Sequence, residues 1–243
     1  MHTITRREHP GRFPAAAVLL SALAWLGAGA PAGPQSPPAR PQGPYLGQTP
    51  PGNTPVVFAP GVVSTDAHEF ACSFTPDGGE FYFTRRETPR SPTLIMVTRR
   101  TADGWTAPEP AAFNDPSARM TFEPRVTPDG RRLYFSSDRP LAGSAGPGGM
   151  PALNIWYVER EGSAWSPPRE AGPPFTPMRA MYVSAARSGT IYTTDISGGP
   201  GTEGIAVARL ASGSYAPLER LGPPRDVTVV PGSSTALLLS SRS

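Results

Sequence analysis

The chain has 243 residues, of which 33 are proline, 26 are glycine and one is cysteine. This share of proline and glycine favours a protein of many short strands and tight turns over a helical one. The formal charge is +3, and the first thirty residues account for +2 of it (three arginines, one glutamate). No basic run remains after them, which argues against a nucleic-acid partner. The single cysteine, Cys72, rules out an intramolecular disulfide, and we expect it to be buried beside a core strand as a small apolar residue.

Residues 1–30 have the features of a secretory signal peptide. Arginines at positions 6, 7 and 12 precede an apolar stretch from Ala15 to Leu26, and small residues follow it. Because this stretch is too short to span a membrane, we expect a periplasmic or secreted protein with no membrane span after cleavage. The paired arginines leave a twin-arginine export route open, and an uncleaved anchor is the alternative.

Residues 31–55 are rich in proline, glycine and glutamine and poor in aliphatic side chains. A segment of this composition buries too little apolar surface to fold by itself, so it predicts a disordered, extended linker. The folded part then comprises residues 56–243.

An internal repeat is the strongest signal in this folded part. Segments 74–84 and 126–136 share the pattern T-P-D-G-x-x-x-Y-F-[ST], which predicts a strand, a Pro-Asp-Gly turn and a second strand. A second pattern recurs three times, an isoleucine followed ten residues later by an aromatic residue: Ile95, Ile155 and Ile205 with Trp105, Trp165 and Tyr215. Four short antiparallel strands per unit are typical of a β-propeller blade.

We therefore predict an all-β protein, a β-propeller of four-stranded antiparallel blades. Its blades are expected at residues 69–115, 123–175 and 180–222, with a partial blade at 226–243. The third unit has lost the turn motif and carries Ala185 to Gly189 in its place.

The shared pattern, followed in the second unit by Ser136-Ser137-Asp138-Arg139, resembles the WD40-like (PD40) repeat of TolB-type proteins. The resemblance implies a six-bladed periplasmic propeller that binds proteins. Because about three and a half blades are present, we expect a fragment of such a ring. The alternatives are completion of the ring by a partner chain or a second copy, and closure of a small, irregular propeller.

Candidate catalytic groups are few. His68 is the one histidine after residue 30, so any Ser-His-Asp or Cys-His mechanism would need it, and otherwise it is a solvated loop residue. Asp77 and Asp129 lie inside the Pro-Asp-Gly turns, where a structural role is expected. Trp105 and Trp165 recur at one position per unit, which indicates packing between blades. No metal-binding motif occurs, so we predict no metal and no cofactor, with calcium binding by loop carboxylates left open.

Loops that enter the first strand and leave the second strand of each blade would gather on one face of a propeller. They carry charged residues of both signs, which form the candidate binding site: His68, Glu69, Arg85, Arg86, Glu123, Asp138 and Arg139. Such a set suits recognition of a polar protein or peptide, and ion pairs between blades are the structural alternative. The glycine-rich loop 141–152 could cover this face.

The sequence thus predicts a non-catalytic binding scaffold with a protein or peptide partner. The alternative from the enzyme class is a propeller associated with a peptidase or glycosidase, its catalytic part missing or dependent on His68. A degenerate gene product is a third hypothesis, suggested by the altered third repeat.

Overall fold

A computed structural model describes residues 40–50, 52–140, 153–175, 180–196 and 201–221. Over these residues the protein is all-β, as predicted, and its helical content is one three-residue 3-10 turn, η1 (Tyr45–Gly47). The predicted signal peptide, the first part of the predicted linker, loop 141–152 and the partial blade at 226–243 lie outside the described residues.

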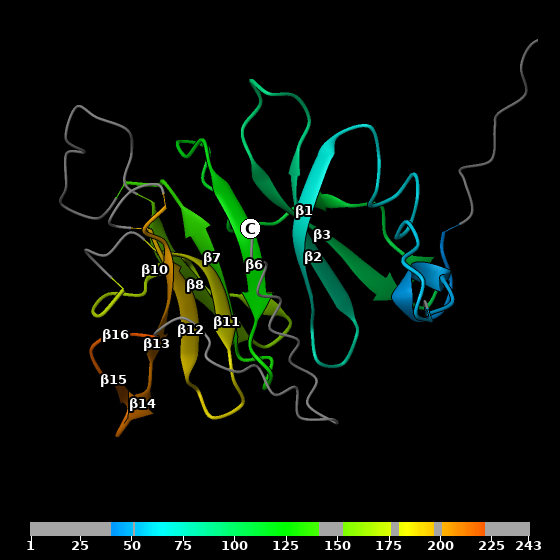
Figure 1. The fold of residues 1–243 in the computed structure, drawn as a ribbon. Coiled ribbons are helices and arrows are strands. Elements are labelled where there is room, and N and C mark those ends of the chain that lie inside the picture. The colour runs from blue at the N-terminus through cyan, green and yellow to red at the C-terminus, as the bar shows by residue number, and fades with distance from the viewer. Residues whose placement is uncertain (1–39, 51, 141–152, 176–179, 197–200, 222–243) are drawn as a thin grey trace, which may run out of the picture. The chain divides into compact units, whose positions relative to one another are not determined.

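Antiparallel pairing joins the main strands into three sheets, each a meander in chain order (Figure 1). The first sheet consists of β1 (His68–Phe74), β2 (Glu80–Arg86), β3 (Leu94–Thr101) and β5 (Glu109–Pro110), with β4 (Gly104–Trp105) also paired to β3. The second consists of β6 (Thr121–Val126), β7 (Arg132–Ser137), β8 (Asn154–Glu161) and β10 (Arg169–Glu170), with β9 (Ala164–Trp165) also paired to β8. The third consists of β11 (Ala180–Ala185), β12 (Ile191–Asp195), β13 (Gly204–Ala208) and β16 (Glu219–Arg220), and the hairpin β14 (Leu210–Ala211) to β15 (Ser214–Tyr215) follows β13.

The Pro-Asp-Gly segments form the turns between the first and second strands, which confirms the repeat at this level. Gly78 N–H donates to the Thr75 carbonyl at 2.8 Å, and Gly130 N–H donates to that of Thr127 at the same distance. In the third sheet Gly189 N–H donates to the Ala186 carbonyl at 2.9 Å, so the turn persists although the motif is gone. Glycine at positive φ is the feature that all three turns share.

A β-bulge interrupts the first strand of every sheet at the same place. The bulge residues are Ala71, Glu123 and Tyr182, with φ of 44°, 59° and 56°, and the strand register shifts at each of them. A non-glycine residue in this backbone region is strained and persists where the surroundings impose it. The recurrence shows that the three sheets share a detail of backbone geometry that the sequence pattern does not reveal.

Apolar clusters fill the space between consecutive sheets. Between the first and second sheets, Tyr82 and Val97 pack with Leu133, Phe135 and Val158. Between the second and third sheets, the buried apolar residues are Tyr134, Ile155, Phe175, Ala180, Val183, Ala185, Ile191 and Ala208. Burial of these side chains provides the main stabilisation of the fold.

The other face of the first sheet is covered by the segment that precedes it. Leu46, Ala59 and Val63 are buried against Phe81 and Phe83 of β2. Residues 40–50 also hydrogen-bond to β4, because Trp105 donates its backbone N–H to Pro41 (2.9 Å) and its indole N–H to Gly43 (2.7 Å). The described part of the segment predicted as a linker therefore makes specific contacts with the first sheet.

Cys72 departs from the expectation of a buried residue, since its side chain is exposed. The bulge at Ala71 is the cause. It pairs Cys72 with Phe83, whereas an unbroken register would place Cys72 opposite Tyr82, whose side chain is buried between the sheets. Cys72 thus lies on the face that carries Phe74 and Phe81, at an apolar hollow of about 290 Å³.

Candidate functional site

Four of the predicted site residues lie together at the ends of β1 and β2. Strand register places His68 opposite Arg86 and Glu69 opposite Arg85. Arg85 Nε donates to Glu69 Oε1 at 3.0 Å, and its Nη2 donates to the carbonyls of Val62 and Val63 at 3.1 Å each. This pair therefore fixes the chain that leads into β1, while His68 at the strand end is exposed.

Glu123 is 5% exposed and connects all three sheets. Its backbone N–H donates to Thr84 Oγ1 of the first sheet at 2.9 Å. Its Oε2 accepts the Ser136 hydroxyl at 3.3 Å and the backbone N–H of Tyr182 in the third sheet at 2.9 Å. Burial raises the pKa of the Glu123 carboxyl to about 7, partly offset by the hydrogen bonds from Tyr182 and Ser136.

Asp138 and Arg139 follow β7 and bind to different parts of the chain. Asp138 Oδ1 accepts the backbone N–H of Met120 at 2.9 Å. The Arg139 guanidinium lies 5.1 Å from the ring centroids of Phe135 and of Trp156 and donates to the Phe113 carbonyl at 2.7 Å. Burial lowers the pKa of Arg139. Between described residues, the hydrogen bonds of these two residues do not connect them to the four at the ends of β1 and β2.

Contacts between the inner strands β1, β6 and β11 hold this region together. In addition to the contacts of Glu123, the backbone N–H of Val126 donates to Ser73 Oγ at 3.0 Å. The loop after β2 is tied to the chain before β6, because Thr93 N–H donates to the Arg119 carbonyl and Thr121 N–H to the Thr93 carbonyl, both at 2.9 Å. These contacts join loops of two sheets into one surface.

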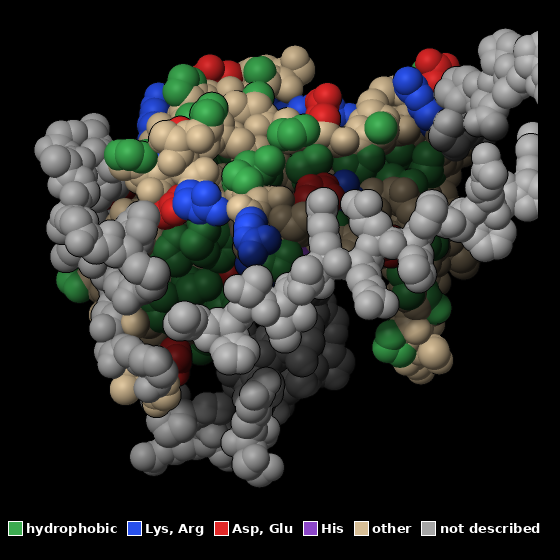
Figure 2. All heavy atoms as spheres, turned by 90° about the horizontal axis from the view of Figure 1, so that it is seen from above, with side chains coloured by type: hydrophobic (Ala, Val, Ile, Leu, Met, Phe, Trp, Pro, Cys, Tyr) green, Lys and Arg blue, Asp and Glu red, His purple; other side chains and the backbone are tan. Residues whose placement is uncertain are grey.

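Two large side chains of this region are exposed and were not predicted from the sequence. Met120 is 38% exposed beside the start of β6, and Tyr182 is 59% exposed at the bulge of β11. No motif marks either residue. The bulge in β11, which sequence alternation does not encode, is what brings Tyr182 to the surface. On the face seen in Figure 2, basic and acidic side chains are interspersed with hydrophobic ones.

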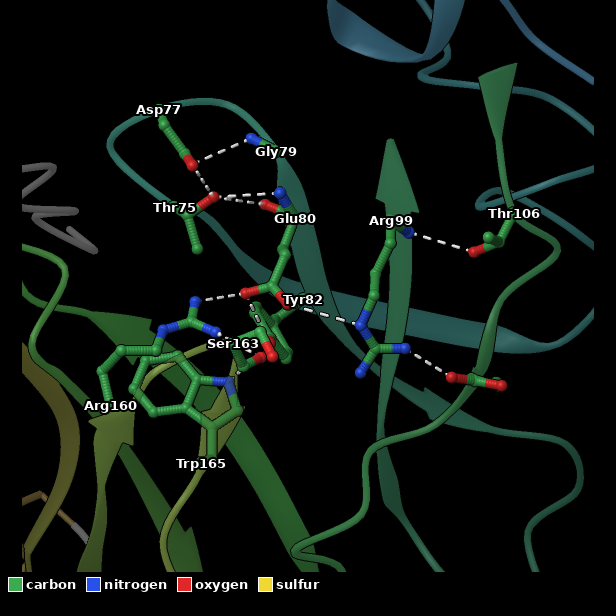
Figure 3. A network of polar contacts seen from close by, with 11 residues as sticks. Thr75, Asp77, Gly79, Glu80, Tyr82, Arg99, Thr106, Arg160, Ser163 and Trp165 are labelled. Atoms are coloured by element: carbon green, nitrogen blue, oxygen red, sulfur yellow. Dashed lines mark hydrogen bonds and ion pairs between the residues drawn. The ribbon is translucent and has the colours of Figure 1, made fainter. Parts of the chain in front are cut away.

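A second region lies between the first and second sheets, at the other ends of their strands (Figure 3). Trp165 Nε1 donates to the Tyr82 hydroxyl at 2.6 Å, and the Arg160 guanidinium lies 4.0 Å from the Trp165 ring centroid. The Glu80 carboxylate accepts hydrogen bonds from both Arg160 and Arg99. Tyr82, Arg99 and Trp165 line a cavity of about 520 Å³. We call this place between the two sheets, the cavity together with the charged side chains beside it, the first groove.

Between the second and third sheets, at the Pro-Asp-Gly ends of the strands, lies a cavity of about 420 Å³, which we call the second groove. The cavity whose lining corresponds to that of the 520 Å³ cavity is a separate one of about 300 Å³. Tyr134 and Tyr215 occupy the positions of Tyr82 and Trp165, and their hydroxyl oxygens are 3.3 Å apart. Arg132 donates to Glu159 Oε1 at 2.8 Å, and Glu159 Oε2 accepts from Arg169 at 3.0 Å. Both grooves are within the size range of small-molecule sites.

His68 and the clusters of acidic side chains are the candidates for catalysis and for metal binding. The His68 ring lies 5.2 Å from that of Phe70, and within the described residues no hydrogen bond or ion pair joins it to a serine, cysteine or carboxylate. Within the same residues, no three His, Cys, Asp or Glu side chains gather as metal ligands would. None of the helical structure described there is long and apolar enough to cross a membrane.

Comparison with known proteins identified one solved structure of interest. No family model and no curated protein matches the chain. The solved structure, from Bacteroides uniformis, is of a protein described as a candidate 6-phosphogluconolactonase. It is 15% identical with a TM-score of 0.34, and the match covers 68% of this chain and 45% of that protein. The chain thus spans less than half the length of that protein, and a likeness this weak carries no functional argument.

These findings correct the family prediction. The resemblance to TolB-type PD40 proteins is wrong, because no family model matches the chain and the solved structure reported above carries a different description. The physical reason is that a Thr-Pro-Asp-Gly turn between two strands is a general solution for a tight antiparallel connection. The recurrence of this turn is evidence for an internal repeat, but it does not identify a family.

Proposed function

We propose that the chain is a non-catalytic binding module that recognises a protein or peptide partner. The surface assigned to this role comprises the exposed His68, Met120 and Tyr182, with Arg86 paired opposite His68. Tyrosine, methionine and arginine are enriched in protein interfaces, where a large side chain contributes contact area at modest entropic cost.

The observation that carries this proposal is the set of hydrogen bonds that joins β6 to β1 and β2 of the first sheet and to β11 of the third. Through Thr84, Glu123 and the N–H of Tyr182, three sheets hold their inner strands in fixed relative positions. A surface presented on such a scaffold loses little freedom on binding, which favours affinity. The remaining predicted site residues support this surface: Glu69, Arg85, Glu123, Asp138 and Arg139.

The wider architecture and setting belong to the same proposal. We propose that the three meander sheets are blades of a β-propeller, because they share turn, bulge and inter-sheet contacts at corresponding positions. The chain would be periplasmic or secreted after removal of residues 1–30.

The test is selection of peptides from a random displayed library on the purified protein. The selected peptides are then titrated against Met120→Ala and Tyr182→Ala, with Leu210→Ala as a control that removes another exposed apolar side chain. We expect each of the two variants to weaken binding by about tenfold and the control to leave it unchanged. Equal binding by all variants would refute the surface. Hydrolysis of ester, peptide or glycoside substrates that disappears in His68→Ala would replace the binding proposal with the enzyme alternative.

A further inference from the structure

Strand register defines corresponding positions in the two grooves. Glu80 and Arg132 each open the second strand of their sheet, and they pair with Arg99 and Glu159 on the third. Arg160 and Leu210 correspond in the same way, because Arg160 pairs with Trp165 and Leu210 pairs with Tyr215. The two grooves can therefore be compared residue by residue.

The charged side chains of the first groove neutralise one another. Glu80 and Arg99 of the first sheet bind each other, and Arg99 also binds Glu109. This row has one positive and two negative charges, and Arg160 reaches over from the second sheet to Glu80. The four side chains together carry no net charge, and the carboxylate of Glu80 is the anion that satisfies two arginines (Figure 3).

The second groove has the reverse charges and lacks the fourth member. Its row of Arg132, Glu159 and Arg169 has two positive charges and one negative charge. The position that would supply a compensating acid from the third sheet holds Leu210, which is 43% exposed. The row therefore keeps a net charge of +1, and none of the described side chains of the third sheet forms an ion pair with it.

Two further arginines add to this excess. Arg131 and Arg187 line the second groove from the turns of the second and third sheets, and both are exposed. Among the described residues, neither guanidinium group forms a hydrogen bond or an ion pair. Asp129 also lines the groove and keeps its negative charge, which offsets one of these two arginines. Its carboxylate accepts from Thr127 and from the Arg131 backbone N–H, and Glu159 binds two arginines.

The apolar part of the lining completes the site. Tyr134, Ile191 and Tyr215 contribute ring and aliphatic surface, and the hydroxyls of the two tyrosines lie beside the Arg132 row. A guanidinium binds a carboxylate or phosphate through two parallel charge-assisted hydrogen bonds. The lining therefore combines oxyanion donors with a surface on which a ring can pack.

We propose that the second groove binds a small organic anion, with its carboxylate or phosphate on Arg131, Arg132 and Arg187 and its apolar body against Tyr134 and Tyr215. This site lies at the Pro-Asp-Gly ends of the strands, away from the surface that the proposed partner would occupy.

Isothermal titration of the full chain with phenyl phosphate and with benzoate tests the proposal, with benzyl alcohol as the uncharged probe. We expect binding of one or both anions in the millimolar range or tighter and none of the alcohol. Stronger binding of phenyl phosphate assigns a phosphate group to the natural ligand, and stronger binding of benzoate assigns a carboxylate. Absence of binding by both anions overturns the proposal.

Variants then locate the binding. Arg131→Gln with Arg187→Gln should weaken it by about tenfold, since two charge-assisted contacts are removed. Leu210→Glu should abolish it by supplying the missing acid, and the exposure of Leu210 leaves room for the longer side chain. Arg100→Gln, which removes an exposed arginine of the first sheet, is the matched control. Circular dichroism and thermal unfolding confirm that each variant folds. Unchanged affinity in the double variant or in Leu210→Glu, or an equal loss in Arg100→Gln, would sink the idea.

Discussion

Replacement of Glu123 by glutamine should stabilise the protein above neutral pH and leave it almost unchanged in acid. The carboxyl is 5% exposed, and burial raises its pKa from 4.5 to about 7. The carboxylate form accepts only one backbone N–H and one hydroxyl, and the salt bridges between described residues do not include it. Glutamine keeps an oxygen that can accept both hydrogen bonds and remains uncharged at every pH.

The magnitude follows from the difference in proton binding. Between pH 4.5 and about 7 the folded protein holds a proton on Glu123 that the unfolded chain has released. Stability therefore falls as pH rises through this interval, and the loss is complete above the folded pKa. A shift of this size corresponds to about 3 kcal/mol of unfolding free energy. That is a large fraction of the stability of an ordinary domain.

Urea unfolding followed by tryptophan fluorescence at pH 5, 6, 7 and 8 measures the effect. The difference in unfolding free energy between Glu123→Gln and wild type should rise from about 1 kcal/mol at pH 5 to about 3 kcal/mol in favour of the variant at pH 8. Glu161→Gln, which removes an exposed carboxylate, controls for the loss of one negative charge. If the difference in unfolding free energy between Glu123→Gln and wild type is the same at every pH in this range, the pKa of Glu123 in the folded protein is not raised and the reasoning is refuted.

Three other predictions concern packing and reactivity. Cys72 should react with a disulfide reagent in the folded protein because its side chain is exposed. The reaction should be slower at pH 8 than after unfolding, because desolvation of the thiol raises its pKa; equal rates would contradict this. Tyr82→Phe should lower the unfolding free energy by about 1–2 kcal/mol, since the indole N–H of Trp165 loses its acceptor, and urea unfolding against wild type measures it. Leu46→Ala should cost about 2–4 kcal/mol and shift the fluorescence of buried Trp105 to the red; an unchanged spectrum and stability would mean that residues 40–50 do not cover the first sheet.

The elements that the sequence predicts well are those fixed by neighbouring residues. Thr75 to Gly78 form their turn through bonds within the segment, because Asp77 accepts from both the Thr75 hydroxyl and the Gly79 N–H. These bonds also lower the pKa of Asp77, which fits the structural role expected of it. The recurrence of Trp165 likewise predicted packing between sheets, and the residue does contact Tyr82 of the preceding sheet.

Features that depend on distant parts of the chain could not be predicted in this way. The bulge at Ala71 exposes Cys72, yet alanine has no local preference for positive φ that would reveal it. Residues 40–50 look like a linker by composition, but Leu46 becomes buried because the face of the first sheet needs cover. Among the predicted site residues, Arg139 was assigned to the binding face because of its charge. Its position in the structure is instead determined by its contact with the Phe135 ring and its hydrogen bond to the Phe113 carbonyl.

Differences between the repeats are more informative about function than the repeats themselves. The recurring residues, such as Tyr82 and Tyr134, are accounted for by the contacts that every pair of adjacent sheets needs. The charged row of the second groove is the reverse of that in the first. Packing gives no reason for this row to keep a net positive charge. Leu210 is half-exposed and stands where an ion-pair partner is possible, so the uncompensated charge is not a consequence of burial. A scaffold that needs only to hold its sheets together would be expected to neutralise that charge as the first groove does, and for this reason we assign the excess to a ligand.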